Sequence, residues 1–159
     1  MTTIAPGGVP VAGDLAPDFT LRSTADTPVT LSSLRGQKHV LLAFFPFAFS
    51  RVCTEEFCEM RDHWDAFARH DLEVFPISVD SPHALREFKA KHGMQVTLLS
   101  DFHREVSAAY GTLFGDAGFS NRGYVLIDKE GVIRWRFVEE TPGTRREHTE
   151  LLAEIAKLA

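Results

Sequence analysis

Residues that could carry chemistry gather in one stretch, Phe44 to Cys58, which holds both cysteines of the protein. Within it, Pro46, Ser50 and Cys53 follow the spacing Pro-x3-Ser-x2-Cys. A thiol that attacks an electrophile needs a lowered pKa, a hydrogen-bonding neighbour and shelter from bulk water. Ser50 can turn its hydroxyl toward the sulfur or toward a bound oxygen, and Pro46 with its neighbouring phenylalanines can shield a pocket. The pattern therefore indicates a nucleophilic cysteine.

The elements around Cys53 are predicted from the apolar pattern. Val40 to Phe45 is a short apolar run that predicts a buried strand, and Pro46 ends it. After Cys53 the spacing becomes helical, with an apolar stripe made of Phe57, Met60, Trp64 and Phe67 and an end near His70. Cys53 thus lies at a helix entrance, where first-turn N–H groups and the helix dipole favour a thiolate. An inert buried cysteine is the alternative, and the helix-entrance position disfavours it.

Bulk composition excludes several classes of protein. The 159 residues, 44% hydrophobic and 25% charged, predict one globular domain over 1–159, with residues 1–12 as a mobile tail. A net charge of −5 without a long basic run disfavours nucleic-acid binding. The N-terminus lacks a signal-peptide pattern, and no apolar stretch approaches the ~20 residues of a membrane span. We therefore expect a cytoplasmic protein that binds no membrane. In that reducing compartment, cysteines are more often reactive or inert than part of a structural disulfide.

Strands and helices alternate through the middle of the chain, and a hairpin followed by a helix closes it. This order predicts an α/β fold with a mixed central sheet flanked by helices. The predicted strands are 18–21, 29–31, 40–45, 74–79, 96–99, 123–127 and 132–138, and the predicted helices are 53–70, 81–93, 103–110 and 145–158, with a short helical turn at 32–36.

The cysteine stretch resembles the signature of the peroxiredoxin family, in which a proline and a threonine or serine precede the peroxidatic cysteine. Residues 16–21 resemble that family's N-terminal strand, and residues 121–123 resemble the segment that carries its active-site arginine. The resemblance spans Asp14 to Leu158 and is greatest for the alkyl hydroperoxide reductase E branch. It implies a thioredoxin-like fold.

The resemblance also implies an activity and a set of roles. The chain is expected to be a thiol peroxidase that reduces hydrogen peroxide and organic hydroperoxides without a metal or other cofactor. Cys53 attacks the peroxide and becomes a sulfenic acid. Arg122 donates hydrogen bonds to thiolate and peroxide, Ser50 bridges them in place of the commoner threonine, Pro46 shields the site and Glu56 places Arg122.

Cys58 has two interpretations. Five helical residues separate the Cα atoms of Cys53 and Cys58 by ~8.5 Å, more than the ~7 Å that a disulfide allows, so a bond between them requires the helix to unwind. The spacing matches the Q-type, or bacterioferritin comigratory, peroxiredoxins, which implies that Cys58 resolves the sulfenic acid. Otherwise Cys58 is a bystander in a one-cysteine enzyme. The resemblance further implies a thioredoxin-like or low-molecular-weight thiol reductant, and it suggests a homodimer.

Three other functions fit parts of the pattern. A zinc site built on Cys53, Cys58 and His63 lacks the usual ligand spacing and an evident fourth ligand. A thioredoxin-like thiol–disulfide oxidoreductase normally has two residues between its cysteines, whereas four intervene here. A peroxide sensor or binding module on the same fold stays open.

Overall fold

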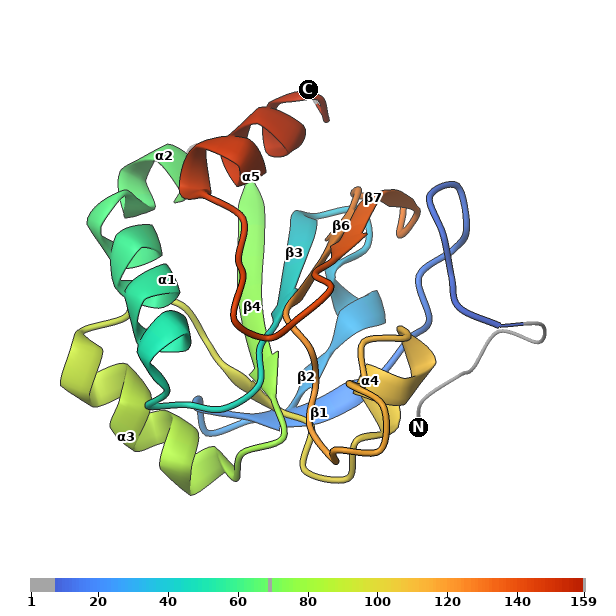
Figure 1. Ribbon diagram of the computed structural model, residues 1–159. Coiled ribbons are helices and arrows are strands. Elements are labelled where there is room, and N and C mark those ends of the chain that lie inside the picture. The colour runs from blue at the N-terminus through green and yellow to red at the C-terminus, as the bar shows by residue number, and fades with distance from the viewer. Residues whose placement is uncertain (1–7, 69, 159) are drawn as a thin grey trace.

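A seven-stranded mixed sheet forms the centre of this computed structural model, which describes residues 8–68 and 70–158 (Figure 1). The strand order is β2-β1-β5-β4-β3-β6-β7; β3, β4 and β5 are parallel neighbours, and the remaining pairs are antiparallel. The strands are β1 (Thr20–Ser23), β2 (Val29–Thr30), β3 (His39–Phe44), β4 (Leu72–Ser78), β5 (Leu99–Ser100), β6 (Gly123–Ile127) and β7 (Ile133–Val138). The predicted α/β fold with a mixed sheet is confirmed.

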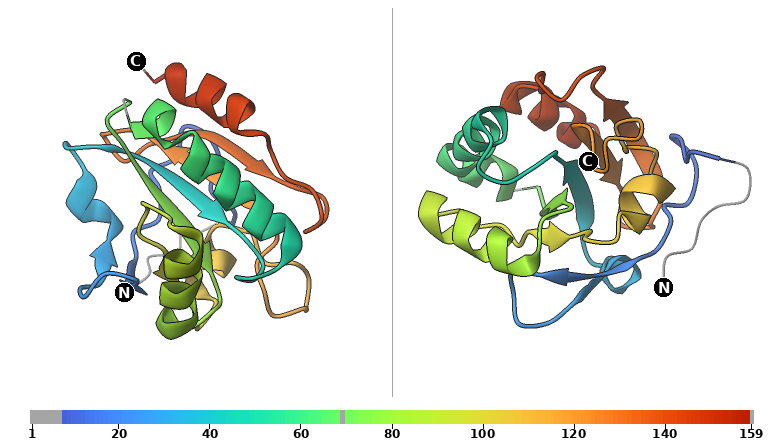
Figure 2. Two further views of the ribbon diagram at one scale, coloured as in Figure 1. Left: turned by 90° about the vertical axis from the view of Figure 1, so that its left-hand side faces the viewer. Right: turned by 60° about the horizontal axis from the view of Figure 1, so that its bottom comes forward.

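Helices cover both faces of the sheet, because the central strands are apolar on both sides (Figures 1 and 2). One apolar cluster packs α1, α3 and α5 against side chains such as Leu41 and Ala43, and the other packs α4 and the N-terminal strands against Leu42 and Phe44. The helices are η1 (Leu31–Leu34, 3-10), α1 (Arg51–Asp62), α2 (Trp64–Ala68), α3 (Pro82–His92), α4 (Glu105–Ala109) and α5 (His148–Ala156).

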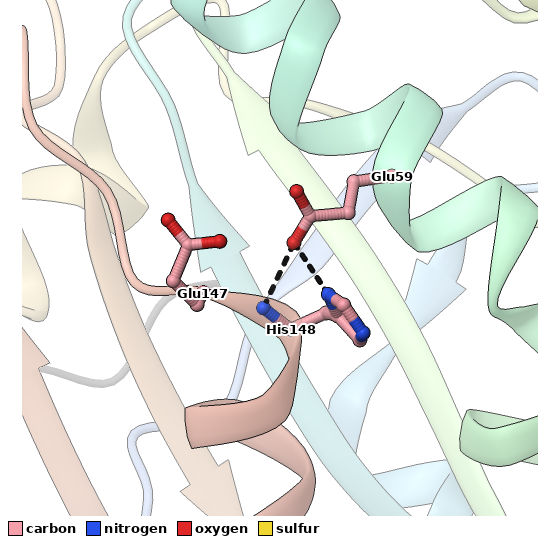
Figure 3. A group of neighbouring side chains, drawn as sticks. All are labelled: Glu59, Glu147 and His148. Carbon is pink, nitrogen blue, oxygen red and sulfur yellow. Dashed lines mark hydrogen bonds and ion pairs between the residues drawn. The ribbon is translucent and has the colours of Figure 1, made fainter.

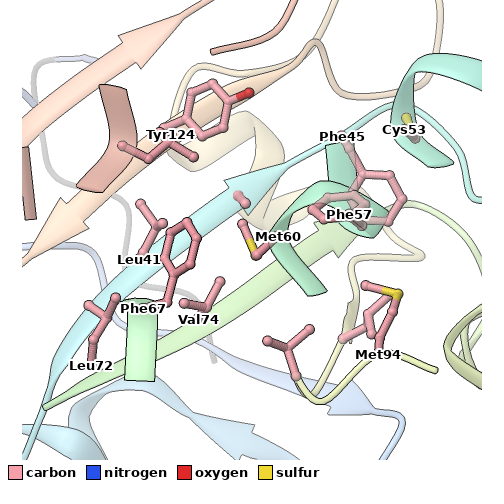
Figure 4. Packing of buried hydrophobic residues seen from close by; sticks show 14 of the residues in the cluster. Leu41, Phe45, Cys53, Phe57, Met60, Phe67, Leu72, Val74, Met94 and Tyr124 are labelled. Carbon is pink, nitrogen blue, oxygen red and sulfur yellow. The ribbon is translucent and has the colours of Figure 1, made fainter. Parts of the chain in front are cut away.

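The strand β3 and the helix α1 place the cysteine stretch. Phe45 extends β3 by one hydrogen bond to Ile77, and its ring lies 4.8 Å from that of Phe57 on α1, centroid to centroid. Figure 4 shows Phe45, Phe57 and Cys53 together at one end of the apolar cluster. Packing of the apolar face of α1 onto β3 therefore fixes where its first turn lies.

The ends of α3 follow sequence signals. Ser81 is the N-cap and accepts a hydrogen bond from the Ala84 N–H at 3.2 Å, and Pro82 occupies the first turn. Gly93 ends the helix in the left-handed conformation at φ 58°. Glycine adopts that conformation without a side-chain penalty. α3 therefore stops at His92, beside α1.

Several boundaries differ from the sequence prediction. The long helix predicted after Cys53 is broken at His63 into α1 and α2, because His63 leaves helical geometry at φ −113°, ψ 23°. The third buried strand lies at Leu99–Ser100 rather than 96–99, and α5 begins three residues after Arg145 because Glu147 is its N-cap. These shifts leave the element order unchanged.

The N-terminal segment falls partly outside the described residues. Of the tail predicted over 1–12, residues 1–7 are not described. Pro10 is buried, and the N–H of Gly13 donates to the Ile133 carbonyl at 2.8 Å. The described helices include none with the length and apolarity that crossing a membrane requires.

Candidate active site

Cys53 lies in the first turn of α1, as its sequence position predicts. Its side chain is fully buried, and its Sγ accepts a hydrogen bond from Nη2 of Arg122 at 3.0 Å. Ser50 is the N-cap residue, but its side chain does not cap the helix, and the first turn carries no acidic residue. The positive end of α1 and a guanidinium therefore both lie at the sulfur.

Arg122 brings a buried cation to the sulfur. It immediately precedes β6, is 1% exposed, and is joined to Glu56 by an ion pair of 3.2 Å between Nη1 and Oε1. Nη2 also donates to the carbonyl of Pro142 at 3.2 Å, whereas Nε has no hydrogen-bond partner among the described residues. One N–H of the buried guanidinium thus has no acceptor among the described residues.

Glu56 and Tyr124 hold the guanidinium in place. The Tyr124 hydroxyl donates to Oε2 of Glu56, while Oε1 faces Arg122. Burial raises the pKa of Glu56, and the Arg122 charge and both hydrogen bonds oppose that rise. Burial acts to lower the pKa of Arg122, but Glu56 and Cys53 outweigh it and raise the pKa, so Arg122 stays charged.

A hollow of about 290 Å³ lies beside Arg122 at the start of α1, and the buried Cys53 is not among the residues that line it. Its lining includes Pro46, Ser50 and Arg122, together with Phe47 and Phe119, whose rings lie 5.1 Å apart between centroids. The Ser50 side chain is half-buried, and its hydroxyl donates to the Phe47 carbonyl at 3.0 Å. The predicted site residues Pro46, Ser50 and Arg122 thus meet in one hollow at the entrance of the Cys53 helix.

The segment from Glu139 to His148 crosses the site and returns to α1 (Figure 2). Pro142 contacts Arg122 from it, and the Arg146 N–H donates to the Tyr124 hydroxyl at 3.1 Å. We call this segment the strap.

Glu59 of α1 anchors the end of the strap. Its carboxylate accepts hydrogen bonds from the Arg145 guanidinium at 2.8 Å and from the N–H and Nδ1 of His148 at 3.1 and 2.5 Å (Figure 3). Glu59, Glu147 and His148 are near enough to one another to hold a metal ion. The Arg145 cation already pairs with Glu59, which indicates a structural clamp at the start of α5 instead.

Cys58 lies elsewhere on α1, away from the hollow. It is half-buried, it is a free thiol like Cys53, and its Sγ lies 3.7 Å from Nδ1 of His92 on α3. Because α1 is continuous from Arg51 to Asp62, both cysteines belong to one intact helix, as expected. His63 instead stacks on His148 at 4.0 Å between ring centroids, and no group of metal-ligand type among the described residues joins it to the two cysteines.

Sequence reasoning missed Tyr124, Glu59 and Pro142 as parts of the site. Tyr124 follows Arg122 by two residues, so both side chains point to the same face near the start of β6. The alternation of side chains along a strand could therefore have predicted Tyr124 beside Arg122. Nothing local marked Pro142 or Glu59, because their roles arise from contacts with residues far along the chain.

Comparisons with known proteins show which family this chain resembles. The AhpC/TSA family profile matches residues 12–136. The chain is 42% identical over 137 residues to alkyl hydroperoxide reductase E of Mycobacterium tuberculosis, covering 85% of this chain and 89% of that protein. It is 33% identical over 142 residues to a thioredoxin peroxidase of Echinococcus granulosus, covering 83% and 73%. The reduced 2-Cys peroxiredoxin of Plasmodium vivax superposes with a TM-score of 0.86 at 32% identity, covering 92% of this chain and 81% of that one.

Replacing Glu59 with glutamine is expected to loosen the strap and make stability depend less on pH. The hydrogen bond from Arg145 outweighs burial and, with those from His148, lowers the pKa of Glu59 from 4.5 to about 2. Its partly exposed position reduces the gain, so Glu59→Gln should lower the free energy of unfolding by about 1–2 kcal/mol at pH 7. Because the folded-state pKa is depressed, this difference should persist above about pH 4.5 and shrink as the pH falls toward about 2.

Urea unfolding at several pH values measures the difference. Glu55→Gln, at an exposed position on the same helix, serves as the matched control and should change stability little. An equal loss in both variants, or a Glu59→Gln deficit that does not diminish in acid, would contradict the clamp.

Proposed function

The chain belongs to the AhpC/TSA family of peroxiredoxins, and from this premise we propose that its Cys53 thiolate reduces hydrogen peroxide and organic hydroperoxides. The observation that carries the proposal is the 3.0 Å contact between Cys53 Sγ and the buried Arg122 guanidinium, beside a hollow open to solvent. The fold is the thioredoxin-like fold of its structural relatives. The protein is a thiol peroxidase.

In the first step, the Cys53 thiolate attacks the distal oxygen of the hydroperoxide. The S–O bond forms as the O–O bond breaks; the sulfur keeps the hydroxyl as a sulfenic acid, and the departing alkoxide or hydroxide takes up a proton. Negative charge therefore moves from the sulfur to the leaving oxygen. A fixed cation that spans both positions lowers the barrier, because it stabilises the charge throughout this movement.

Arg122 is suited to this role. Its Nη2 already donates to the sulfur, and the Arg122 side chain also lines the hollow through which a peroxide would enter. Glu56 and Tyr124 fix the guanidinium, so little reorganisation accompanies the reaction. Glu56 is thus a positioning residue.

Pro46 and Ser50 complete the proposed substrate site. Pro46, Phe47 and Phe119 line the hollow and limit the water that reaches the reacting atoms. The Ser50 hydroxyl, which donates to the Phe47 carbonyl at 3.0 Å, would rotate to bridge peroxide and thiolate. Rotation about a single Cα–Cβ bond is sufficient.

We assign the resolving step to Cys58. Its thiol would attack the Cys53 sulfenic acid once the first turns of α1 unwind, forming an intramolecular disulfide that a thioredoxin-like or small thiol reduces. The proposal includes a cytoplasmic location, where both cysteines return to free thiols, and a homodimer. The exposed rings of Phe47 and Phe49 beside the site offer apolar surface for a second copy.

A thioredoxin-like oxidoreductase is the less suitable alternative. Such an enzyme needs two cysteines that close a disulfide without rebuilding a helix. Cys53 and Cys58 lie on one intact helix, and Cys53 is fully buried.

Cysteine variants separate the two steps. We expect Cys53→Ser to abolish peroxide consumption, because no thiolate remains beside Arg122. Cys58→Ser should leave the rate of Cys53 oxidation within about two-fold, yet stop turnover that depends on a thioredoxin-like reductant. Stopped-flow fluorescence and steady-state peroxide assays measure both, with His63→Ala as a control that keeps activity. Peroxide consumption by Cys53→Ser would refute the function.

Replacing Arg122 with methionine tests the charge argument. The lost donor should slow Cys53 oxidation by about 100-fold or more, as loss of a comparable transition-state donor does elsewhere. Arg134→Met, at a half-exposed position outside the site, is the matched control and should react at the normal rate. Equal rates for Arg122→Met and the unmodified protein would remove Arg122 from the mechanism.

Mass measurement decides the role of Cys58. After about one equivalent of peroxide and blocking of free thiols, an intramolecular disulfide gives a chain lighter by about two hydrogens with no blocked thiol. A one-cysteine cycle instead gives an added oxygen on Cys53 and a blocked Cys58. The second result would overturn the resolving role while leaving the peroxidase function intact.

A further inference from the structure

Cys58 has a specific partner that the peroxidatic site does not explain. Nδ1 of His92 lies 3.7 Å from Cys58 Sγ, within hydrogen-bond range for sulfur, and both side chains are half-buried where α1 meets α3 (Figure 2). The two residues are 34 positions apart in the chain, so tertiary packing alone brings them together. A thiol beside an imidazole is the pairing that activates cysteine nucleophiles.

One contact to the ring of His92 and one to its backbone carbonyl hold this residue in position. Its ring packs edge-on against Phe88, one turn earlier on α3, at 5.1 Å between centroids. Its own carbonyl accepts a hydrogen bond from Nη1 of Arg61 on α1 at 2.6 Å. Because Arg61 lies on α1, three residues after Cys58, this bond ties α1 to α3 close to Cys58.

Charged side chains lie near the pair on both helices. His92 is the last residue of α3, whose last turn also carries Lys89 and Lys91. On α1, Arg61 donates to the His92 carbonyl and is itself paired with Asp62 at 3.0 Å. The feature that permits a proton transfer from sulfur to imidazole is therefore the 3.7 Å contact between Cys58 Sγ and His92 Nδ1.

We propose that His92 acts as the base for the second half-reaction, taking the Cys58 proton and presenting its thiolate to the oxidised Cys53. This rests on the proposed function, with Cys58 as the resolving cysteine. The Cys58 thiolate attacks the sulfur of the Cys53 sulfenic acid; the S–S bond forms as the S–O bond breaks. The leaving hydroxide takes the proton from the imidazolium and becomes water. The sulfenic sulfur is reduced and the Cys58 sulfur is oxidised, so no outside reactant is needed.

The same contacts indicate which half of α1 moves. Cys58 and Arg61 are both tied to His92, so that half of the helix stays against α3. The Cys53 half is preceded by Phe49, whose φ is 69°. A bulky residue is strained in this left-handed conformation, although the Phe49 ring packs on Phe88 of α3 at 5.2 Å between centroids. In the proposed step the first turn of α1 unwinds, Cys53 travels to Cys58, and His92 keeps the thiolate in place.

Variants of His92 test the proposal in the full chain. Oxidation of Cys53 by peroxide should stay within about two-fold in His92→Asn and His92→Gln, whereas disulfide formation at pH 7 should slow by at least about ten-fold. The loss should diminish as the pH rises and the thiol ionises without help. Added imidazole should partly restore His92→Ala, a rescue that a purely structural role would not give. His83→Asn, at an exposed position on the same helix, is the matched control and should leave both steps unchanged.

A second measurement does not depend on α1 unwinding. In a Cys53→Ser background, iodoacetamide should alkylate Cys58 at pH 7 at least about five-fold more slowly when His92 is replaced by asparagine or glutamine.

The outcomes distinguish the role of His92, the resolving step and the peroxidase function. Disulfide formation and alkylation at unchanged rates in both His92 variants overturn the role of His92 and leave the peroxidase intact. Sulfenic acid without a disulfide in the unmodified protein overturns the resolving step and His92 with it. Absence of Cys53 oxidation by peroxide overturns the proposed function itself.

Discussion

A single buried guanidinium is the constraint on which the rest of the structure depends. Arg122 is among the largest fully buried side chains. A cation removed from water is tolerated only when charges and hydrogen bonds surround it. Here Glu56, the Cys53 sulfur and the Pro142 carbonyl supply them. The cation in turn makes an otherwise apolar position suitable for a thiolate. The contacts that allow Arg122 to be buried are therefore the same contacts that place it beside the Cys53 sulfur.

These contacts also explain how distant segments converge. α1 supplies both Cys53 and Glu56, three residues apart and so on one helix face, while the start of β6 supplies Arg122. The strap closes over them and is anchored back to α1 through Glu59. The supports of the cation thus lie on α1, on the sheet and on the anchored strap, which gives the site rigidity beside its solvent-facing hollow.

α1 has to satisfy two opposing demands. An intact first turn, together with Arg122, stabilises the Cys53 thiolate, and the same turn prevents Cys53 from meeting Cys58. The structure assigns the two demands to different parts of the helix. The Cys53 half is held by Arg122 and follows Phe49, whose φ is 69°, whereas the Cys58 half contacts the end of α3. In the proposed cycle, the contacts to Arg122 are lost when the first turn unwinds, while those to α3 are kept.

The sequence by itself determined the strand–loop–helix order around Cys53 and the mixed α/β architecture, and it predicted Cys53 as the nucleophile. Each of these depends on local properties, namely apolar periodicity, proline and glycine positions, and the spacing from Pro46 to Cys53. The motif also singled out Arg122, although nothing local to that arginine predicted its burial. Only the tertiary structure decided that Tyr124 and Pro142 complete the surroundings of Arg122, that Glu59 anchors the strap, and that His92 contacts Cys58. Those contacts join residues distant in the chain, and their existence depends on the relative placement of packed helices and strands, which no local pattern encodes.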